Sequence, residues 1–330
     1  MARTLHNNPE AKEFEQVKCL ICDVSSSESL ANVSAHGFPV HVVICTQCGL
    51  VYLNPRWTKA RYQSFYAEEY DSHFRNSFNK GHTTGASTPQ VLTFEQETAE
   101  VAFSRLRDAN LMPQTIKSLL DIGSGSGGFI QQARQIFPDV ACAAIEPSAN
   151  CVPLLLRAGV DHLSANVDSN WDANHKDTFD FIYMRHVLEH FLNPLETLHK
   201  IKDVLTENGL VYIAVPNGLD PDLPVLKSHF RVVHTYYFSR GTLQRLLGMA
   251  GLVPQLVIEG DRSNRHELVV VAKPGTPTVR ESSTYLEHRE VLRKHIEYEQ
   301  SMPYRARKAM RAGKHKLGRV ARRFRYVIHG

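Results

Sequence analysis

The sequence predicts an α/β fold in which helices cover a largely parallel β-sheet. From Ser118 onward, short apolar runs alternate with helical segments, a pattern typical of parallel strands joined by helices. Only residues 260–265 separate the last two apolar runs, so the sheet is expected to end in an antiparallel hairpin. One helix is expected over residues 191–205, with Gly209 as its C-terminal cap. The predicted strands are residues 118–122, 140–146, 161–163, 179–184, 210–216, 254–259 and 266–273.

The chain is expected to divide into four segments. Residues 15–58 hold two cysteine pairs among short β-like runs. Residues 59–110 are expected to form a helical connector, in which the Gly/Ser/Thr/Pro-rich loop 79–90 is the candidate boundary. The sheet domain is expected over residues 111–273. Residues 274–330 have no strand pattern and are expected to form a helical, basic tail.

The composition is that of a globular protein, with 42% hydrophobic and 22% charged residues in a chain of 330. No run of about 18 apolar residues exists that could span a membrane, and the first 16 residues lack the apolar core of a signal peptide. A cytoplasmic location is therefore expected. Six cysteines do not indicate a disulfide framework in that compartment, and Cys142 and Cys151 are expected to be core residues.

The stretch LLDIGSGSGGFI, residues 119–130, is predicted to be a strand, a glycine-rich turn and the start of a helix. In a parallel sheet this is where glycines let a ligand approach the backbone. Glu146 ends the second predicted strand, and its carboxylate could accept hydrogen bonds from both ribose hydroxyls of an adenosine. This much fits NAD and S-adenosylmethionine equally, and the glycines could also serve only to make a tight turn.

Asp121 separates the two cofactors, because it lies directly before the turn, where NAD would place its anionic pyrophosphate. Two unit charges about 4 Å apart at an effective dielectric near 20 interact by about 4 kcal/mol, so this carboxylate would repel the pyrophosphate. S-adenosylmethionine carries a sulfonium and an ammonium instead, and both favour a nearby negative charge. The loop is therefore predicted to bind S-adenosylmethionine.

The sheet domain also resembles the class I S-adenosylmethionine-dependent methyltransferases, over roughly residues 117–273. The subgroup that it is most similar to contains the ubiquinone-biosynthesis O-methyltransferases and many sugar and polysaccharide methyltransferases. The resemblance rests on LLDIGSGSGGFI, AAIEPS, FDFIYMRHVLEHFLNPLETLHKI, GLVYIAVPN and HTYYFSRGTLQRLLGMAGL. It implies a Rossmann-like, seven-stranded doubly wound sheet, with Glu146 on the ribose. Around the methionine moiety it implies Asp121, Gly123, Gly125 and Gly127.

Four cysteines are spaced as two zinc knuckles, Cys19-x2-Cys22 and Cys45-x2-Cys48. Zinc takes four thiolates tetrahedrally, and a two-residue spacer lets one knuckle present two sulfurs. We therefore predict a structural zinc ribbon, with unligated thiols as the alternative. Four cysteines leave no open coordination position, so this zinc is not expected to be catalytic.

The stretch CTQCGLVYLNPRWTKARYQSFYAEEY resembles the cysteine-rich module that precedes bacterial methyltransferase domains encoded with sugar and surface-polysaccharide genes. Some deoxysugar C-methyltransferases have a comparable module, followed after the methyltransferase domain by a large α/β domain. Only about 57 residues follow Lys273 here, which argues against C-methylation of a nucleotide keto-sugar. A nucleic-acid partner is not expected, because the module lacks an interleaved basic and aromatic face.

The run RHVLEHF follows the fourth strand and supplies the candidate catalytic residues. His186, Glu189 and His190 would share one face if the segment were helical. Methyl transfer to a hydroxyl requires removal of its proton, and a histidine with a pKa near 6.5 suits this role. His190 is the candidate base and Glu189 would orient its ring; alternatively, both residues only brace the following helix.

The resembling O-methyltransferases have Glu, Glu and His at the positions of His186, Glu189 and His190, where the trio is associated with a divalent cation. His186 replaces the first Glu, which argues against magnesium and leaves a softer ion or none. His234 lies in the long segment after the fifth strand, which in these folds tends to cover the acceptor. With Tyr236 and Tyr237 it could contact a sugar ring, or all three could be core residues.

The predicted function is O-methylation of a sugar or cell-surface glycan precursor by an S-adenosylmethionine-dependent methyltransferase. The alternatives are a C- or N-methyltransferase, and a zinc-ribbon binding protein with an inactive methyltransferase domain.

The tail is the most basic part of the chain, since residues 303–330 contain ten Lys or Arg and no acidic residue. Its apolar and basic residues fall at helical spacing, which favours an anionic membrane surface as a peripheral partner. The alternatives are the acidic body of the protein itself, another protein, or a nucleic acid. The apolar positions are Leu317, Val320, Ala321, Phe324, Val327 and Ile328.

Overall fold

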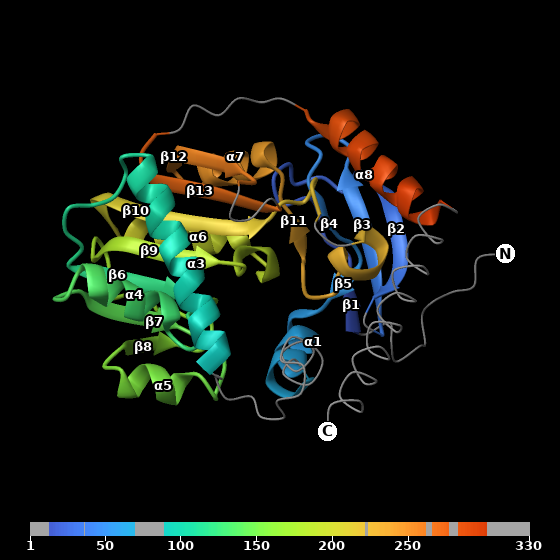
Figure 1. Cartoon of the computed structure of the whole chain (residues 1–330). Coiled ribbons are helices and arrows are strands. Elements are labelled where there is room, and N and C mark those ends of the chain that lie inside the picture. Colours follow the sequence, from blue (N-terminus) through green and yellow to red (C-terminus); the bar gives the residue numbers. More distant parts are fainter. Residues whose placement is uncertain are drawn as a thin grey trace, which may run out of the picture.

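The computed structural model describes residues 13–35, 37–69, 89–221, 224–261, 266–276 and 283–301. Within these ranges the chain forms a seven-stranded sheet with helices on both faces, and a smaller four-stranded sheet beside it (Figure 1). No helix in these ranges is long and apolar enough to cross a membrane. The predicted amphipathic helix of the tail lies outside the described residues.

The seven-stranded sheet has the strand order β12-β13-β10-β9-β6-β7-β8. Five neighbouring strands are parallel, while β13 runs antiparallel to both β10 and β12, so the predicted terminal hairpin is confirmed. Every predicted strand is present. Their bounds are β6 Ser118–Ile122, β7 Ala141–Ile145, β8 Asp161–Ser164, β9 Phe179–Arg185, β10 Leu205–Pro216, β12 Leu252–Glu259 and β13 Glu267–Pro274.

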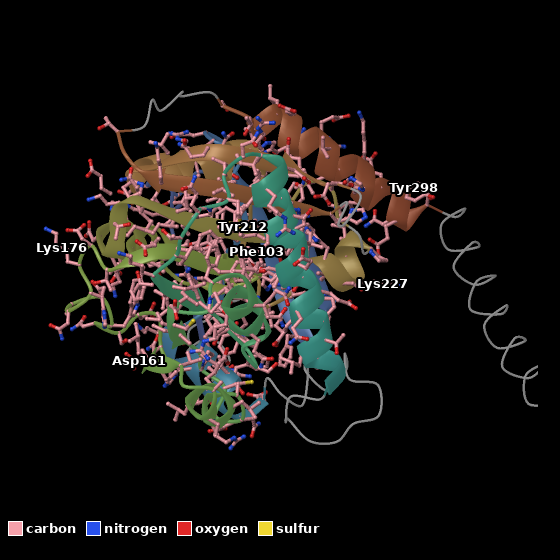
Figure 2. The ribbon with its side chains drawn as sticks, turned by 60° about the vertical axis from the view of Figure 1, so that its left-hand side comes forward. Phe103, Asp161, Lys176, Tyr212, Lys227 and Tyr298 are labelled. Atoms are coloured by element: carbon pink, nitrogen blue, oxygen red, sulfur yellow. The ribbon has the colours of Figure 1, made fainter. Side chains whose placement is uncertain are left out.

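Alternate side chains of the central strands face two separate layers of helices. Leu119 and Tyr212 pack with Phe103 under α3 (Pro89–Asp108), α4 (Gly128–Ile136) and α5 (Val152–Arg157). Leu120 and Ile213 pack on the other face, under α6 (Pro194–Val204) and α7 (Arg240–Met249). Figure 2 shows α3 lying across the sheet, with Phe103 and Tyr212 in the interior.

The predicted cap of the helix before β10 is wrong. Helix α6 ends at Val204, and β10 begins at the next residue, so Gly209 lies within the strand. The pairing of β10 with β9 is irregular between Leu205 and Leu210. A Cβ atom at Gly209 would lie 2.9 Å from the carbonyl oxygen of Phe179. The glycine is therefore explained by close approach of two backbones and not by the end of a helix.

The cysteine module forms its sheet together with a strand from the chain segment between β10 and α7. The sheet order is β11-β4-β3-β2, and β11 pairs antiparallel with β4. A separate pair joins β1 and β5, after which come α1 (Lys59–Ser64) and a π-helical turn (Phe65–Glu69). The strands are β1 Phe14–Glu15, β2 Ser27–Ala35, β3 Phe38–Cys45, β4 Val51–Leu53, β5 Arg56–Trp57 and β11 Tyr236–Tyr237.

Helix α8 (Tyr285–Gln300) follows the seven-stranded sheet in the chain but packs on the cysteine module, against β2 and β3. Arg289 forms an ion pair with Glu28 of β2, with 2.7 Å between Nε and Oε1, and Tyr285 also donates to Glu28. The hydroxyl of Thr284 donates to the carbonyl oxygen of Cys48 at 2.9 Å. This hydrogen bond, the Thr284–Cys48 latch, joins the beginning of the tail to the second cysteine knuckle.

Candidate active site and metal centre

The glycine-rich loop joins β6 to α4 at the carboxyl edge of the sheet. Gly123, Gly125 and Gly127 all have positive φ angles, of 77°, 54° and 84°, which other residues adopt only with strain. A Cβ atom at Gly125 would lie 2.5 Å from Oε1 of Glu95. Glycine is therefore required at this position both by the backbone and by the close approach of a side chain.

Three carboxylates converge on this loop. Glu146 accepts hydrogen bonds from the backbone N–H groups of Gly125 and Ser148, each at 2.8 Å. Asp121 is buried, and its Oδ2 atom has no hydrogen-bond partner among the described residues. Burial raises the pKa of Asp121 well above its usual range, and the charges of Glu95 and Glu146 raise it further. A cationic ligand would relieve this repulsion, as the sulfonium and ammonium of S-adenosylmethionine would.

Glu95 of α3 contacts the glycine-rich loop, and the sequence did not indicate this residue. Its carboxylate accepts hydrogen bonds from the backbone N–H groups of Ser126, at 3.2 Å, and Gly128, at 3.1 Å, and from the Ser126 hydroxyl. It thereby satisfies N–H groups at the start of α4. Because Glu95 lies 31 residues before Ser126, only the packing of α3 on α4 brings it to the loop.

The four predicted catalytic side chains lie together beyond the carboxyl end of β9. His186 Nδ1 and His190 Nε2 are each 3.7 Å from Oε1 of Glu189. The rings of His190 and His234 meet edge to face, with 4.9 Å between their centroids. The segment does not form an α-helix: His186 has a φ of 53°, and only Leu188–His190 form a 3-10 turn. The residues meet through this turn and not through i, i+3, i+4 spacing.

His190 has a defined tautomer. Its Nδ1 atom lies 2.8 Å from the carbonyl oxygen of Val233, which can only accept, so Nδ1 carries the proton. Nε2 therefore presents its lone pair on the side of Glu189. Burial lowers the pKa of His190 to about 4, so the expectation of an ordinary histidine pKa is wrong for the protein without bound ligands.

Glu189 is a buried carboxyl group with neither oxygen hydrogen-bonded among the described residues. Burial raises the pKa of Glu189 to about 8. The pair Glu189 and His190 is therefore largely uncharged at neutral pH and holds one proton on each residue. A charged group that approaches the pair can move the proton from Glu189 to His190 with little change in the net charge of the pair.

His186 faces a different partner. Its Nε2 atom lies 3.0 Å from Oε1 of Glu267 on β13, a carboxylate that also pairs with Arg105 and Arg185. His186 is thus tied to a buried ion network. It was expected beside Glu189 as part of a trio, but its shorter contact is with Glu267.

His234 is buried against His190, whereas the two neighbouring tyrosines are used by the protein itself. Tyr237 accepts from the N–H of Arg231 at 2.9 Å, and Tyr236 contacts Arg56. Both tyrosines lie in β11. Of the three side chains that could contact an acceptor or be core residues, His234 lies with the catalytic candidates.

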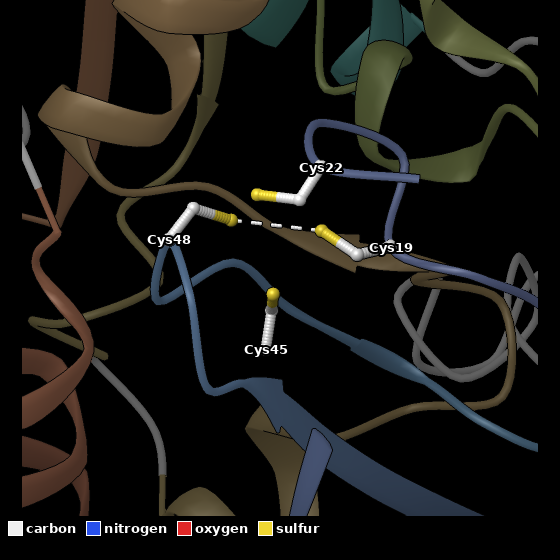
Figure 3. Close-up of side chains that lie close together, drawn as sticks. All are labelled: Cys19, Cys22, Cys45 and Cys48. Atoms are coloured by element: carbon white, nitrogen blue, oxygen red, sulfur yellow. Dashed lines mark hydrogen bonds between the residues drawn. The ribbon is translucent and has the colours of Figure 1, made fainter. Parts of the chain in front are cut away.

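The four cysteines of the two knuckles converge (Figure 3). Their sulfur atoms all lie within 4.8 Å of one another, and those of Cys19 and Cys48 are 3.5 Å apart. Tetrahedral zinc with bonds of about 2.3 Å places its sulfurs about 3.8 Å apart, so the cluster fits this ion. Hydrogen bonds among the cysteines lower the pKa of Cys45 and raise the pKa values of Cys19 and Cys48. Cys142 and Cys151 are buried core residues, as expected.

Residues 94–256 match the family model of a methyltransferase domain. No curated protein matches the chain. Solved structures with similar folds include an S-adenosylmethionine-dependent methyltransferase from Mesorhizobium loti (16% identity, 53% of this chain and 97% of that chain, TM-score 0.42). Another, from Aquifex aeolicus, has 18% identity over 54% of this chain and 97% of that chain, with a TM-score of 0.40. An O-methyltransferase family protein from Burkholderia thailandensis has 14% identity, 66% and 63% coverage and a TM-score of 0.47.

The family match and the mixed seven-stranded sheet establish a methyltransferase domain. The glycine loop with its buried carboxylates belongs to the same stretch of chain, at the carboxyl edge of the sheet. The enzyme is accordingly an S-adenosylmethionine-dependent methyltransferase, with a four-cysteine cluster in an additional N-terminal module.

Proposed function

We propose that this methyltransferase transfers a methyl group to a hydroxyl of a sugar or cell-surface glycan precursor, with His190 as the base. The observation that carries the proposal is the His190–Val233 hydrogen bond, because it leaves Nε2 of His190 as a proton acceptor. Placing the acceptor oxygen in line behind the sulfonium methyl would supply most of the rate, and proton removal the remainder.

The chemistry of the cluster favours an acceptor with several hydroxyl groups. Two carboxyl oxygens of Glu189, Nε2 of His190 and the ring of His234 converge, and among the described residues no Lys or Arg pairs with Glu189. A polyol supplies donors to such a set, and buried polar groups require partners. His186 and Glu267, which are already paired, would border the acceptor.

The experiment is a measurement of S-adenosylhomocysteine release with a panel of free sugars, nucleotide sugars, lipid-linked saccharides, phenols and amines. The proposal expects release with a saccharide and a methyl ether in the product. A product methylated on carbon or nitrogen would contradict the proposal and support C- or N-methylation instead. Tight cofactor binding without release on any acceptor would support a binding protein with an inactive domain.

We further propose that the four-cysteine cluster holds one structural zinc ion. Cys19, Cys22, Cys45 and Cys48 would supply all four ligands, so the ion would organise the two knuckles and take no part in transfer. The latch from Thr284 to Cys48 then links α8 to the metal site.

A catalytic divalent cation is a separate proposal. The residues that would hold it differ from the trio of His186, Glu189 and His190. The ligand atoms of Glu189, His190 and His234 lie within 4.8 Å of one another, whereas His186 is paired with Glu267. Two nitrogens and one oxygen suit zinc or a similar ion better than magnesium. Titration of cofactor-loaded protein with Zn²⁺, with His234→Gln as the comparison, tests the proposal. Binding that is unchanged in this variant would contradict it.

For the tail we propose peripheral contact with an anionic membrane surface through residues 303–330. Each Lys or Arg near such a surface contributes about 1 kcal/mol, and ten are present without an acidic residue. When anionic liposomes are sedimented, the full chain should pellet with them, and a form ending at Ser301 should stay in the supernatant. If both forms stay in the supernatant at low salt, the proposal is wrong.

A further inference from the structure

One guanidinium of the cysteine module joins the two segments that carry His190 and His234. Arg56 of β5 donates from Nη1 to the carbonyl oxygen of Leu192 at 2.9 Å and to the hydroxyl of Tyr236 at 3.3 Å. Leu192 follows His190 by two residues, and Tyr236 follows His234 by two. The side chain of Arg56 is only 12% exposed, and Glu15 fixes its Nε atom at 2.8 Å.

Other atoms of the module contact the same two segments. Tyr62 donates to the carbonyl oxygen of Val232 at 2.7 Å, and the N–H of Leu53 donates to that of Thr235 at 3.0 Å. The hydroxyl of Tyr66 lies 3.3 Å from Nδ1 of His190 itself. The wall of the site around His234 is therefore built against β4, β5 and α1 of the module. None of these elements lies within residues 94–256, the match to the methyltransferase family.

Arg56 is suited to this role by its chemistry. A guanidinium is planar and always charged, and it presents donors in a fixed fork, so it can hold two oxygen atoms at a set separation. Here Nη1 donates to both oxygens while Nε donates to Glu15, and an ammonium group has no second nitrogen with which to reproduce this arrangement. The second contact is with the hydroxyl of Tyr236, which also donates directly to the carbonyl oxygen of Leu192 at 3.3 Å, so removing that hydroxyl weakens the link between the two segments without removing the arginine.

We propose that Arg56 is a positioning residue for the candidate base: by bridging Leu192 and Tyr236 it keeps His190 and His234 in contact, so the cysteine module forms part of the active site. The inference rests on the proposed function only in calling His190 the base. Its geometric content can be tested without an acceptor.

Arg56 acts on the atoms that define the state of His190. The hydrogen bond from His190 to Val233 requires the 230–237 segment to stay close to the 188–192 segment. If that contact opens, Nδ1 loses its acceptor, so the proton of the neutral ring is no longer fixed on Nδ1. The other titratable or charged groups around the ring are Glu189, His186, His234, Tyr66 and Arg231.

The test is nitrogen-15 NMR of histidine-labelled full-length protein, with the His190 signals assigned from His190→Gln among the 17 histidines. In the unsubstituted protein the neutral ring of His190 should carry its proton on Nδ1. In Arg56→Met the Nε2–H tautomer should become populated, because Val233 no longer holds the proton on Nδ1. Arg56→Lys should give a smaller population of that tautomer.

Lys59→Met is the matched control, because it removes one positive charge from the same module. Lys59 is 56% exposed and pairs with Asp168 at 2.7 Å. The His190 signals of Lys59→Met should be the same as those of the unsubstituted protein. S-adenosylmethionine affinity and zinc content, measured on each variant, should stay within about twofold of the parent, because Arg56 contacts neither site.

Tyr236→Phe covers the case in which Arg56→Met fails to fold. It retains the ring and the β11–β4 pairing but removes the hydroxyl, and it should shift His190 in the same direction by a smaller amount. An unchanged tautomer of His190 in folded Arg56→Met, or in Tyr236→Phe where Arg56→Met does not fold, would overturn the inference, even if thermal stability had fallen.

Discussion

Nδ1 of His190 donates a hydrogen bond to the carbonyl oxygen of Val233, a residue 43 positions further along the chain. This bond links the turn after β9 to the long segment between β10 and α7. It also decides which ring nitrogen is free, and therefore which atom of His190 can take a proton.

Removing the ring should separate catalysis from cofactor binding. His190→Ala is expected to retain S-adenosylmethionine affinity and to slow methyl transfer by roughly 10²- to 10⁴-fold, the range for a lost general base. Single-turnover transfer to whichever acceptor the panel identifies is the measurement. His199→Ala, on the outer part of α6, is the control and should behave like the parent. Unchanged transfer in His190→Ala would make His190 a structural residue.

The raised pKa of Glu189 predicts a pH-dependent stability. In the unfolded chain this carboxyl ionises near pH 4.5, but in the folded protein it keeps its proton to about pH 8. The folded state binds more protons in that window, so the contribution of Glu189 to stability is present below pH 4.5 and is lost as pH rises to about 8. The slope is about 1.4 kcal/mol per pH unit at most.

Glu189→Gln should therefore raise the free energy of unfolding relative to the parent at pH 8.5, and by much less at pH 5. Urea denaturation at the two pH values is the measurement. His190 is retained in both proteins, so its own titration largely cancels. Glu196→Gln, on a carboxyl that is 58% exposed, is the control and should show no such difference. If the difference in free energy of unfolding between Glu189→Gln and the parent were the same at both pH values, Glu189 would not be a buried carboxyl that keeps its proton.

The cysteine cluster should contain about one zinc ion per chain, and the ion should be lost when Cys19 and Cys22 are both replaced by serine. Elemental analysis, together with circular dichroism of the purified protein, measures both effects. Cys142→Ser should keep the ion, since Cys142 is a core residue distant in the fold from the knuckles. A soluble, folded preparation without zinc would overturn the metal site.

The latch on the second knuckle should slow the loss of that metal. Thr284→Val removes the hydroxyl that donates to the carbonyl oxygen of Cys48, and with it about 1 kcal/mol. Zinc should then pass to a chromogenic chelator about fivefold faster. Ser283→Ala, at the neighbouring position outside α8, is the control. Equal release from Thr284→Val and the parent would limit the latch to a packing contact.

Much of the sheet domain was predictable, because its strands are short apolar runs separated by helices. Each predicted strand overlaps an observed one, since the buried side chains that mark it are local in the sequence. The helix cap at Gly209 was not predictable in this way. Its glycine is set by the carbonyl oxygen of Phe179 on the neighbouring strand, which the local pattern does not contain.

The candidate site was predictable in its members but not in its contacts. The run RHVLEHF and the segment with His234 pointed to the right side chains. The pairing of His186 with Glu267 depends on β13, which lies 81 residues away. Strand β11 has two residues and no periodicity, so its pairing with β4 arises only from tertiary packing. Glu95 reaches the glycine loop for the same kind of reason, through the packing of α3 on α4.

The central claim is that the loop after β6 binds S-adenosylmethionine, and calorimetry with S-adenosylmethionine and NAD tests it most directly. The protein should bind S-adenosylmethionine and not NAD, and Asp121→Ala or Glu146→Ala should weaken binding by at least about tenfold, because Asp121 would lose its contact with the cationic groups of the cofactor and Glu146 its hydrogen bonds to the ribose. Asp139→Asn, an exposed residue at the opposite edge of the sheet, should bind like the parent. Binding of NAD without binding of S-adenosylmethionine would contradict the account.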